Sequence, residues 1–182
     1  KNICEVGCGA GEIIKIIHDK SPEDTQCYGY EISPEAFEMC QTRKRKRLSF
    51  FLKDILKEKK IFFDLLLCID VFEHVEDYLG FIRELKSKSK YKVFHIPLDL
   101  SVHTVLRETP IIRSRNYNGH LHYYTKYTAI ETLKHCGYKI IDCNYTLTSV
   151  ERGSGTFLNR LGRIPRKVLF KINEDFCVKF LG

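Results

Sequence analysis

The chain has 182 residues, of which 43% are hydrophobic and 29% are charged, and these values are typical of a globular protein with one core. No apolar run approaches the roughly 20 residues that a membrane-spanning helix needs, and no signal-peptide pattern opens the sequence. The formal net charge of +7 favours an anionic partner only weakly, because an excess of this size is common on enzymes.

The first part of the chain predicts alternating strands and helices. Residues 2–6 favour a short strand that leads into a glycine-rich turn, and isoleucines at helical spacing predict a helix over 12–19. A second strand is expected over 27–32. The sequence Ser-Pro-Glu at 33–35 then predicts a helix start, because it supplies an N-cap, a proline in the first turn and an acid near the positive end of the helix dipole. We expect that helix to run to about Lys46.

Three further strands are expected in the middle of the chain. Residues 48–53 predict the third strand, and the almost wholly apolar run 62–69 predicts a central strand that is buried on both faces. A helix over roughly 76–87 precedes a fifth strand at 91–96, which ends before Pro97. This alternation predicts an α/β fold with a doubly wound, mostly parallel, Rossmann-like sheet and helices on both faces.

The next part of the chain is less regular. Residues 98–124 lack clear periodicity and predict a long insertion with room for one helix, and insertions of this length are usually functional. Thr125 is the predicted N-cap of a helix that runs through Cys136, with Gly137 just past its end. Residues 138–147 predict a sixth strand.

We divide the chain into a domain over 1–148 and a C-terminal segment over 149–182 that packs on it as a possible lid. In the C-terminal segment, residues 152–155 predict a loop and Pro165 begins an amphipathic helix. The apolar side of that helix carries Val168, Leu169, Ile172 and Phe176. The cations around it are Arg163, Arg166, Lys167 and Lys171. These cations can meet an anionic membrane surface, although a lid or a packing helix is the favoured interpretation.

Eight cysteines are spread along the chain without a C-x-x-C pair. Most of them lie in apolar segments, where cysteine behaves as a small buried hydrophobe. This spacing predicts free thiols in a reducing cytoplasm rather than a disulfide framework, and it predicts no metal site. Because the chain begins with a lysine and enters a strand at once, we also expect a further stretch before it.

The main functional signal is the segment 5–11, Glu-Val-Gly-Cys-Gly-Ala-Gly. It follows a strand and opens a helix, where glycines allow a tight turn and the close approach of a ligand. Glu31 ends the second strand, at a position where a carboxylate can accept hydrogen bonds from both ribose hydroxyls. Asp54 ends the third strand and can meet an adenine amino group. Together these residues predict a nucleoside-binding cleft.

NAD and S-adenosylmethionine can both occupy such a cleft. The dinucleotide fingerprint G-x-G-x-x-G fails, because its third glycine would fall at Glu12 or at Ile14. A glutamate in the first helical turn would also repel a pyrophosphate. S-adenosylmethionine has no phosphates and carries a positive sulfonium, so an acidic loop suits it better. An NAD-linked oxidoreductase is therefore disfavoured.

The segment 5–11 resembles motif I of class I S-adenosylmethionine-dependent methyltransferases, E/D-x-G-x-G-x-G, and Glu31 and Asp54 match the acids of that family on the ribose and adenine sides. Residues 64–75, which end in Glu-His-Val, resemble the fourth-strand motif of the small-molecule branch, type 11 or type 12. Residues 119–125 resemble a later segment of that branch. The resemblance covers about 1–148. It implies an enzyme that transfers a methyl group from S-adenosylmethionine to a small molecule and releases S-adenosylhomocysteine.

We predict that the cofactor is held by the glycine loop and by the ends of the second, third and fourth strands. The predicted cofactor-binding residues are Glu5, Gly7, Cys8, Gly9, Gly11, Glu31, Ile32, Asp54, Ile55, Ile69 and Asp70. The predicted acceptor pocket comprises Phe72, Glu73, His74, His120, His122 and Tyr124. His74 is the candidate general base, because the pKa of histidine lies near neutral, and a structural hydrogen bond to its loop is the equal alternative.

Two other functions stay open. A nucleic-acid methyltransferase is supported by the five cations at 43–47, although a solvated helix C-terminus explains them more simply. It is disfavoured because the fourth strand ends in Ile-Asp-Val-Phe at 69–72, and not in the Asn/Asp-Pro-Pro-Tyr/Phe pattern of base amino methylation. A nucleoside-binding module without catalysis is the other alternative. The sequence does not separate oxygen, nitrogen and carbon acceptors.

Overall fold

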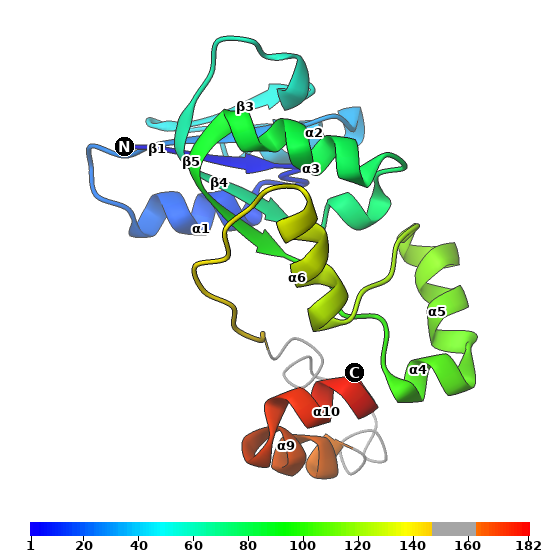
Figure 1. Cartoon of the computed structure of the whole chain (residues 1–182). Helices are drawn as coiled ribbons and strands as arrows, with labels where there is room; N and C mark the ends of the chain where they lie inside the picture. Colours follow the sequence, from blue (N-terminus) through cyan, green and yellow to red (C-terminus); the bar gives the residue numbers. More distant parts are fainter. Residues whose placement is uncertain (147–162) are drawn as a thin grey trace. The chain divides into compact units, whose positions relative to one another are not determined.

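The computed structural model describes residues 1–146 and 163–182, and the chain forms two compact units, Lys1–Ile96 and Pro97–Gly182 (Figure 1). All strands of the described ranges belong to the first unit. None of the helices in these ranges has both the length and the apolarity that a membrane span requires. The domain boundary at 148/149 stays a prediction.

The first unit is built on a parallel sheet of five strands in the order β3-β2-β1-β4-β5. The strands are β1 (Asn2–Val6), β2 (Gln26–Glu31), β3 (Leu48–Leu52), β4 (Phe63–Ile69) and β5 (Ser89–His95). Because β1 pairs with both β2 and β4, the order of the strands reverses on either side of it. In parallel sheets of this kind, ligands bind at the carboxyl ends of the strands beside the reversal. The predicted α/β fold with a parallel sheet is confirmed.

Helices α1 (Glu12–Lys20) and α2 (Pro34–Gln41) pack on the sheet through one apolar cluster. The buried members of the cluster are Cys8, Ile14, Cys27, Cys40, Leu48, Phe50 and Leu67. The strand β4 is buried on both faces, as predicted, because the consecutive residues 66–68 (Leu-Leu-Cys) are all at most 5% exposed. Helix α3 (Tyr78–Leu85) lies between β4 and β5 in the chain. The short 3-10 turns of this unit are η1 (Ile55–Lys57), η2 (Phe72–His74) and η3 (Lys86–Lys88).

The second helix is shorter than predicted. It ends at Gln41 and not near Lys46. The chain then turns back, since Arg45 forms an antiparallel bridge with Leu48 and Arg47 has a φ of +67°. A residue in the left-handed region cannot continue an α-helix, so the five cations form the turn before β3 and not a helix end.

The second unit contains α4 (Val102–Arg107), α5 (Thr109–Arg113), the π-helical turn η4 (Ser114–Asn118), α6 (Lys126–His135), α9 (Arg163–Ile172) and α10 (Glu174–Leu181). The insertion at 98–124 thus holds two short helices and a π turn, where the sequence predicted one helix. Helix α6 begins as predicted, because Thr125 and Thr128 exchange side-chain to backbone hydrogen bonds in a capping box. Gly137 follows the helix with a φ of +83°, also as predicted.

Two predictions for the second unit are wrong. Residues 138–146 form no strand, and none of the five strands of the described sheet pairs with them. The single helix expected from Pro165 through Phe176 is divided, since the side chain of Asn173 accepts a hydrogen bond from the backbone of Phe176 and caps α10 as a separate helix. The loop expected at 152–155 lies outside the described residues.

Candidate functional site

The glycine loop lies between β1 and α1, at the point where the strand order reverses. Two carboxylates, those of Glu5 and Glu31, belong to this part of the site, and both are buried. Glu5, near the end of β1, accepts a hydrogen bond from the backbone N–H of Ile14 at 2.9 Å and so joins the strand to the first turn of α1. Burial, together with the nearby charge of Glu31, raises the pKa of Glu5 to about 7, against the opposing effect of the Ile14 N–H. Glu5 therefore stabilises the connection between β1 and α1 that contains the loop.

Glu31 fastens the loop to the end of β2. Its Oε2 accepts the backbone N–H of Gly9 at 2.7 Å. Its Oε1 accepts the backbone N–H groups of Ile32 at 2.8 Å and of Ser33 at 2.9 Å. The side chain of Ile32, by contrast, is exposed. The carboxylate predicted for the ribose thus reaches the apex of the glycine loop.

The loop requires glycine for two different reasons. At Gly11, with φ +79°, an added Cβ would lie 2.6 Å from Cε1 of Phe50 and 3.0 Å from the Cβ of Cys40. At Gly9, with φ +54°, an added Cβ would meet nothing within 4 Å. Gly11 is therefore held by close packing, whereas Gly9 faces open space and needs glycine only for its backbone conformation.

Asp54 directly follows β3, and it caps the η1 turn by accepting the backbone N–H of Leu56 at 2.9 Å. Its other oxygen lies 3.9 Å from the Lys57 ammonium. The next residue, Ile55, is 2% exposed, so its side chain belongs to the core. The acids Glu31 and Asp54 thus follow neighbouring strands, as the sequence predicts.

A histidine that is not among the predicted site residues lies at the same edge of the sheet. His95 ends β5, and its Nδ1 is 2.5 Å from Oδ1 of Asp70, which follows β4. The backbone N–H of Asp70 also donates to the carbonyl of His95, and Asp70 has a φ of +50°. The hydrogen bond to Asp70 raises the pKa of His95. In the pairing of β4 with β5, His95 lies opposite Ile69, so the residue after β4 comes close to the end of β5.

The predicted acceptor-pocket residues belong to two units. In the first unit, Phe72 and Glu73 are fully buried in η2, whereas the side chain of His74 is 39% exposed, with its Nε2 3.9 Å from Glu73 Oε1. His120, His122 and Tyr124 belong to the second unit. Phe72, Glu73 and His74 follow the end of β4 in the chain.

Within the second unit, His120 takes part in a buried polar cluster. Its Nδ1 lies 2.5 Å from Oδ2 of Asp99 and 2.9 Å from Oγ of Ser114. Its carbonyl accepts the hydroxyl of Tyr123 at 3.0 Å. These contacts join the two ends of the 98–124 insertion, so they support a structural role for His120.

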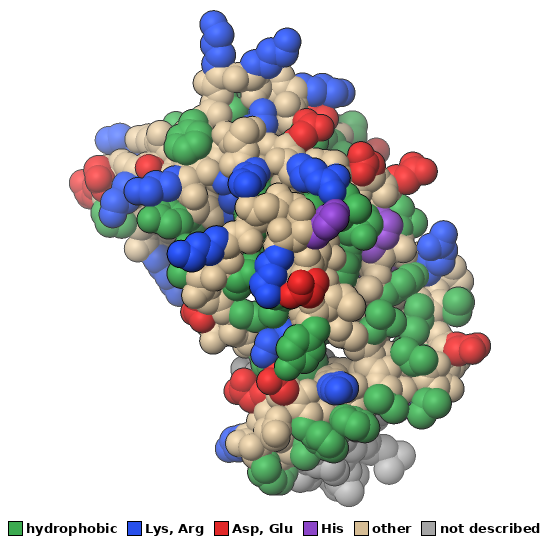
Figure 2. Space-filling model, viewed as in Figure 1, with side chains coloured by type: hydrophobic (Ala, Val, Ile, Leu, Met, Phe, Trp, Pro, Cys, Tyr) green, Lys and Arg blue, Asp and Glu red, His purple; other side chains and the backbone are tan. Residues whose placement is uncertain are grey.

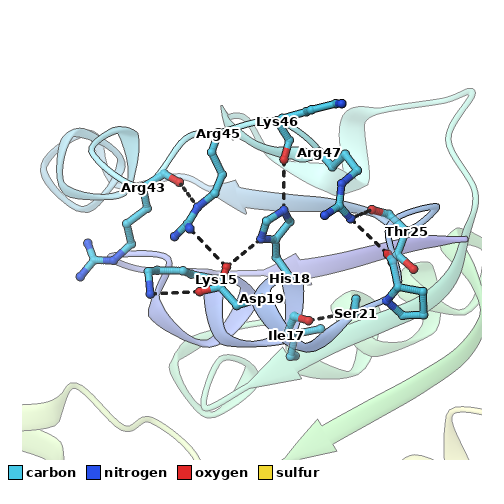
Figure 3. A network of polar contacts seen from close by, with 11 residues as sticks. Lys15, Ile17, His18, Asp19, Ser21, Thr25, Arg43, Arg45, Lys46 and Arg47 are labelled. Atoms are coloured by element: carbon cyan, nitrogen blue, oxygen red, sulfur yellow. Dashed lines mark hydrogen bonds and ion pairs between the residues drawn. The ribbon is translucent and has the colours of Figure 1, made fainter.

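The three arginines of the cationic run at 43–47 bind partners within the first unit, and Figure 3 shows those of Arg45 and Arg47. The guanidinium of Arg43 lies 2.8 Å from the carboxylate of Glu12, and that of Arg45 lies 3.3 Å from Asp19. Both acids belong to α1. The turn before β3 is thereby fastened to that helix.

Backbone carbonyls bind the remaining part of this turn (Figure 3). Arg47 donates through Nη1 to the carbonyls of Pro22 and Thr25, both at 3.1 Å. Nε2 of His18 lies 3.1 Å from the carbonyl oxygen of Lys46. The cationic run therefore has a structural explanation that needs no nucleic acid.

The sequence of this chain is similar to those of known methyltransferases. A family model described as a methyltransferase domain matches residues 1–143. Norajmaline N-methyltransferase of Rauvolfia serpentina is 35% identical over 92 residues, which cover 47% of this chain and 31% of that protein. Ajmaline N-methyltransferase of the same plant matches with the same identity and coverage. The chain thus spans 31% of the length of these relatives.

A solved structure has the same fold over most of the chain. Magnesium protoporphyrin IX methyltransferase from Synechocystis PCC 6803, crystallised with S-adenosylhomocysteine, superposes with a TM-score of 0.60 at 19% identity. The superposition covers 77% of this chain and 65% of that protein. At this identity the likeness shows the fold alone, and the family model shows the membership. The chain therefore belongs to the class I, S-adenosylmethionine-dependent methyltransferase family with its Rossmann-like fold.

Proposed function

We propose that this chain binds S-adenosylmethionine at the carboxyl edge of its sheet and transfers the methyl group to a small-molecule acceptor. The observation that carries the proposal is the clamp between the Glu31 carboxylate and the backbone N–H of Gly9. It places a glycine loop with open space above Gly9 next to two strand-end acids. The curated relatives are named as N-methyltransferases of small molecules, which supports the same reaction class.

The chemistry of the side chains fits this cofactor better than a dinucleotide. The carboxylates at the ends of β2, β3 and β4 are Glu31, Asp54 and Asp70. Such a set can accept hydrogen bonds from ribose and adenine and favours a cation nearby, whereas it would repel phosphates. When bound, S-adenosylmethionine supplies an electrophilic methyl group on a sulfonium. Glycine-loop N–H groups at the start of α1 would hold its carboxylate.

The hydrogen bonds of Glu31 imply that cofactor binding changes the loop. A carboxylate offers about four acceptor positions, and backbone N–H groups already take three of them. A ribose diol needs two. We infer that the bond to Gly9 is exchanged for a ribose hydroxyl, which releases the Gly9 N–H toward the cofactor. Ile32, exposed beside Glu31, can then cover an apolar face of the ligand.

We propose that the residues after β4 contact the molecule that accepts the methyl group. His74 is half-exposed and directly follows that strand in η2, so we propose it as the base for an acceptor that must lose a proton. His120, His122 and Tyr124 remain proposed pocket residues. Positioning of the acceptor against the methyl group is expected to supply most of the rate enhancement.

The cellular compartment and the class of substrate are proposed from the cysteines and from the cationic run. The described cysteines form no disulfide, and most of them are buried, which supports a reducing cytoplasm. Nucleic acid is not favoured as a substrate, because the three arginines of the cationic run bind acids of α1 and backbone carbonyls.

Calorimetric titration with S-adenosylhomocysteine tests the proposal. We expect saturable binding by the wild type and its loss in Glu31→Ala, since that substitution removes three hydrogen-bond acceptor contacts. Glu38→Ala is the matched control, because Glu38 is an exposed carboxylate on the neighbouring helix α2. Equal binding by the wild type and Glu31→Ala, or heat only with NAD, would overturn the proposal.

A further inference from the structure

The positive charge of this protein is concentrated in its second unit. Residues 1–96 carry 17 lysine and arginine side chains against 16 aspartates and glutamates. Residues 97–182 carry 13 against 7, so +6 of the net charge of +7 lies in the second unit. A cationic unit of this kind attracts an anionic surface.

The helices α9 and α10 place apolar side chains on their exposed sides. On α9 these are Val168 and Ile172, which lie one turn apart, and Ile172 is 75% exposed. On α10 they are Phe176 and Phe180, whose rings stack with centroids 4.4 Å apart. Four apolar residues on two packed helices are therefore left uncovered by the described chain.

Other side chains of the two helices hold them together. Cys177 is buried, and its thiol donates to the carbonyl of Arg166 at 3.4 Å. The guanidinium of Arg166 donates to the carbonyl of Leu181. The helix pair thus has residues that pack between the helices and an exposed side that carries the four apolar residues named above.

Lysines alternate with the exposed apolar residues. Lys167 and Lys171 directly precede Val168 and Ile172 and are exposed with them on α9. Lys179 precedes Phe180 on α10 and is exposed as well. An exposed helix face that combines apolar side chains with lysines is typical of helices that lie in the headgroup region of a bilayer.

Helix α4 extends this surface. It lies beside α10, because the end of α10 at Gly182 comes close to Ser101, the N-cap of α4. Its exposed apolar residues are Val102, Val105 and Leu106, of which Leu106 is 80% exposed. Figure 2 shows hydrophobic side chains gathered over α4, α5 and α10.

We propose that this surface, formed by the exposed sides of α4, α9 and α10, binds the face of a bilayer that contains anionic phospholipids. Val168, Ile172, Phe176 and Phe180 would enter the boundary between headgroups and acyl chains, while the lysines meet lipid phosphates. A second copy of the chain fits the surface less well, because a symmetric dimer would bring two cationic faces together. Nucleic acid would use the lysines and leave the aliphatic residues exposed. This proposal does not depend on methyl transfer.

Vesicle sedimentation tests the proposal. Sucrose-loaded vesicles of phosphatidylglycerol mixed with phosphatidylcholine are compared with vesicles of phosphatidylcholine alone. We expect the wild type to bind the anionic vesicles at least about tenfold more tightly, and we expect salt to weaken that binding. The double variant Lys167→Glu, Lys171→Glu should abolish the preference. Its matched control is Lys59→Glu, Lys60→Glu, which changes the same charge at exposed positions of the first unit.

A fluorescent reporter tests insertion independently. The chain has no tryptophan, so Ile172→Trp provides a single probe on α9, and Met39→Trp provides the control at an exposed position of α2. Anionic vesicles should shift the emission of the first probe to the blue and leave the second unchanged. Binding that is equal on both vesicle types, absent from both, or unaffected by the lysine variant would overturn the proposal. A concentration-dependent dimer that Ile172→Glu abolishes would assign the surface to a second copy instead.

Discussion

At the scale of single residues, the site is defined by carboxylates in different surroundings. Glu5 is buried against one backbone N–H, whereas Glu31 is buried against three. Several N–H donors stabilise a carboxylate in its charged form, and burial with one donor does not fully offset desolvation. Two glutamates of the same site therefore have different tasks: Glu31 binds the backbone of the loop and of the turn after β2, and Glu5 joins β1 to α1.

The raised pKa of Glu5 predicts a pH-dependent stability. Its pKa is about 7 in the folded protein and close to the ordinary glutamate value of 4.5 in the unfolded chain. The folded state therefore binds more protons between these values, so stability falls as pH rises from 4.5 to about 7 and is constant above that. Over this window the loss from Glu5 is up to about 3 kcal/mol.

Glu5→Gln should remove that loss while it keeps an oxygen for the Ile14 N–H. Relative to the wild type, the variant should gain stability between pH 4.5 and pH 8, as measured by urea unfolding at both values. Glu38→Gln, which removes an exposed carboxylate, is the control. A wild-type slope against pH in the Glu5 variant would refute the assignment.

At the scale of elements, sequence reasoning succeeded where local rules determine the structure. The apolar run of β4, the caps at Ser33 and Thr125, and the glycine loop follow from patterns within a few residues. It failed where a segment needs a partner strand, as at 138–146, which none of the five strands of the described sheet pairs with. The Asp70–His95 pair was missed for another reason. It depends on which strands are neighbours, and this order is a property of the sheet rather than of either segment.

Packing between elements predicts different effects for two glycines of the loop. Gly11→Ala would place a Cβ against the Phe50 ring of β3 and the Cβ of Cys40 of α2, so we expect a loss of roughly 2–4 kcal/mol from backbone strain and overpacking. Gly9→Ala has a similar φ and no contact within 4 Å, so it should lose only about 1 kcal/mol. Urea midpoints of the two variants give the comparison.

A third variant separates the two causes. Phe50→Leu removes the ring atoms that an alanine at position 11 would meet, so the double variant Gly11→Ala, Phe50→Leu should lose less than the sum of the single losses. Equal losses for Gly9→Ala and Gly11→Ala, or strict additivity with Phe50→Leu, would show that packing around Gly11 is not the cause.

At the scale of the whole molecule, the two units have separate properties. The predicted cofactor residues all lie within 1–96, while the uncovered apolar helices and nearly all of the net charge lie within 97–182. A methyltransferase with this division can keep its cofactor chemistry in the sheet and meet its surroundings through the helical unit. Cofactor binding by the first unit and the proposed membrane binding by the second can therefore be measured independently.

Hydrogen exchange with S-adenosylhomocysteine tests this division. A ligand at a hundred times its dissociation constant stabilises the state that binds it by about 2.7 kcal/mol, which slows exchange through unfolding of the first unit about 100-fold. We expect this slowing in β1 and β4, together with a change at Gly9 as its N–H leaves Glu31. Amides of α9 and α10 should keep their rates, because no predicted cofactor residue lies there. Equal slowing of those helices would mean that the units unfold as one, and the cofactor would then stabilise the membrane-facing surface as well as its own site.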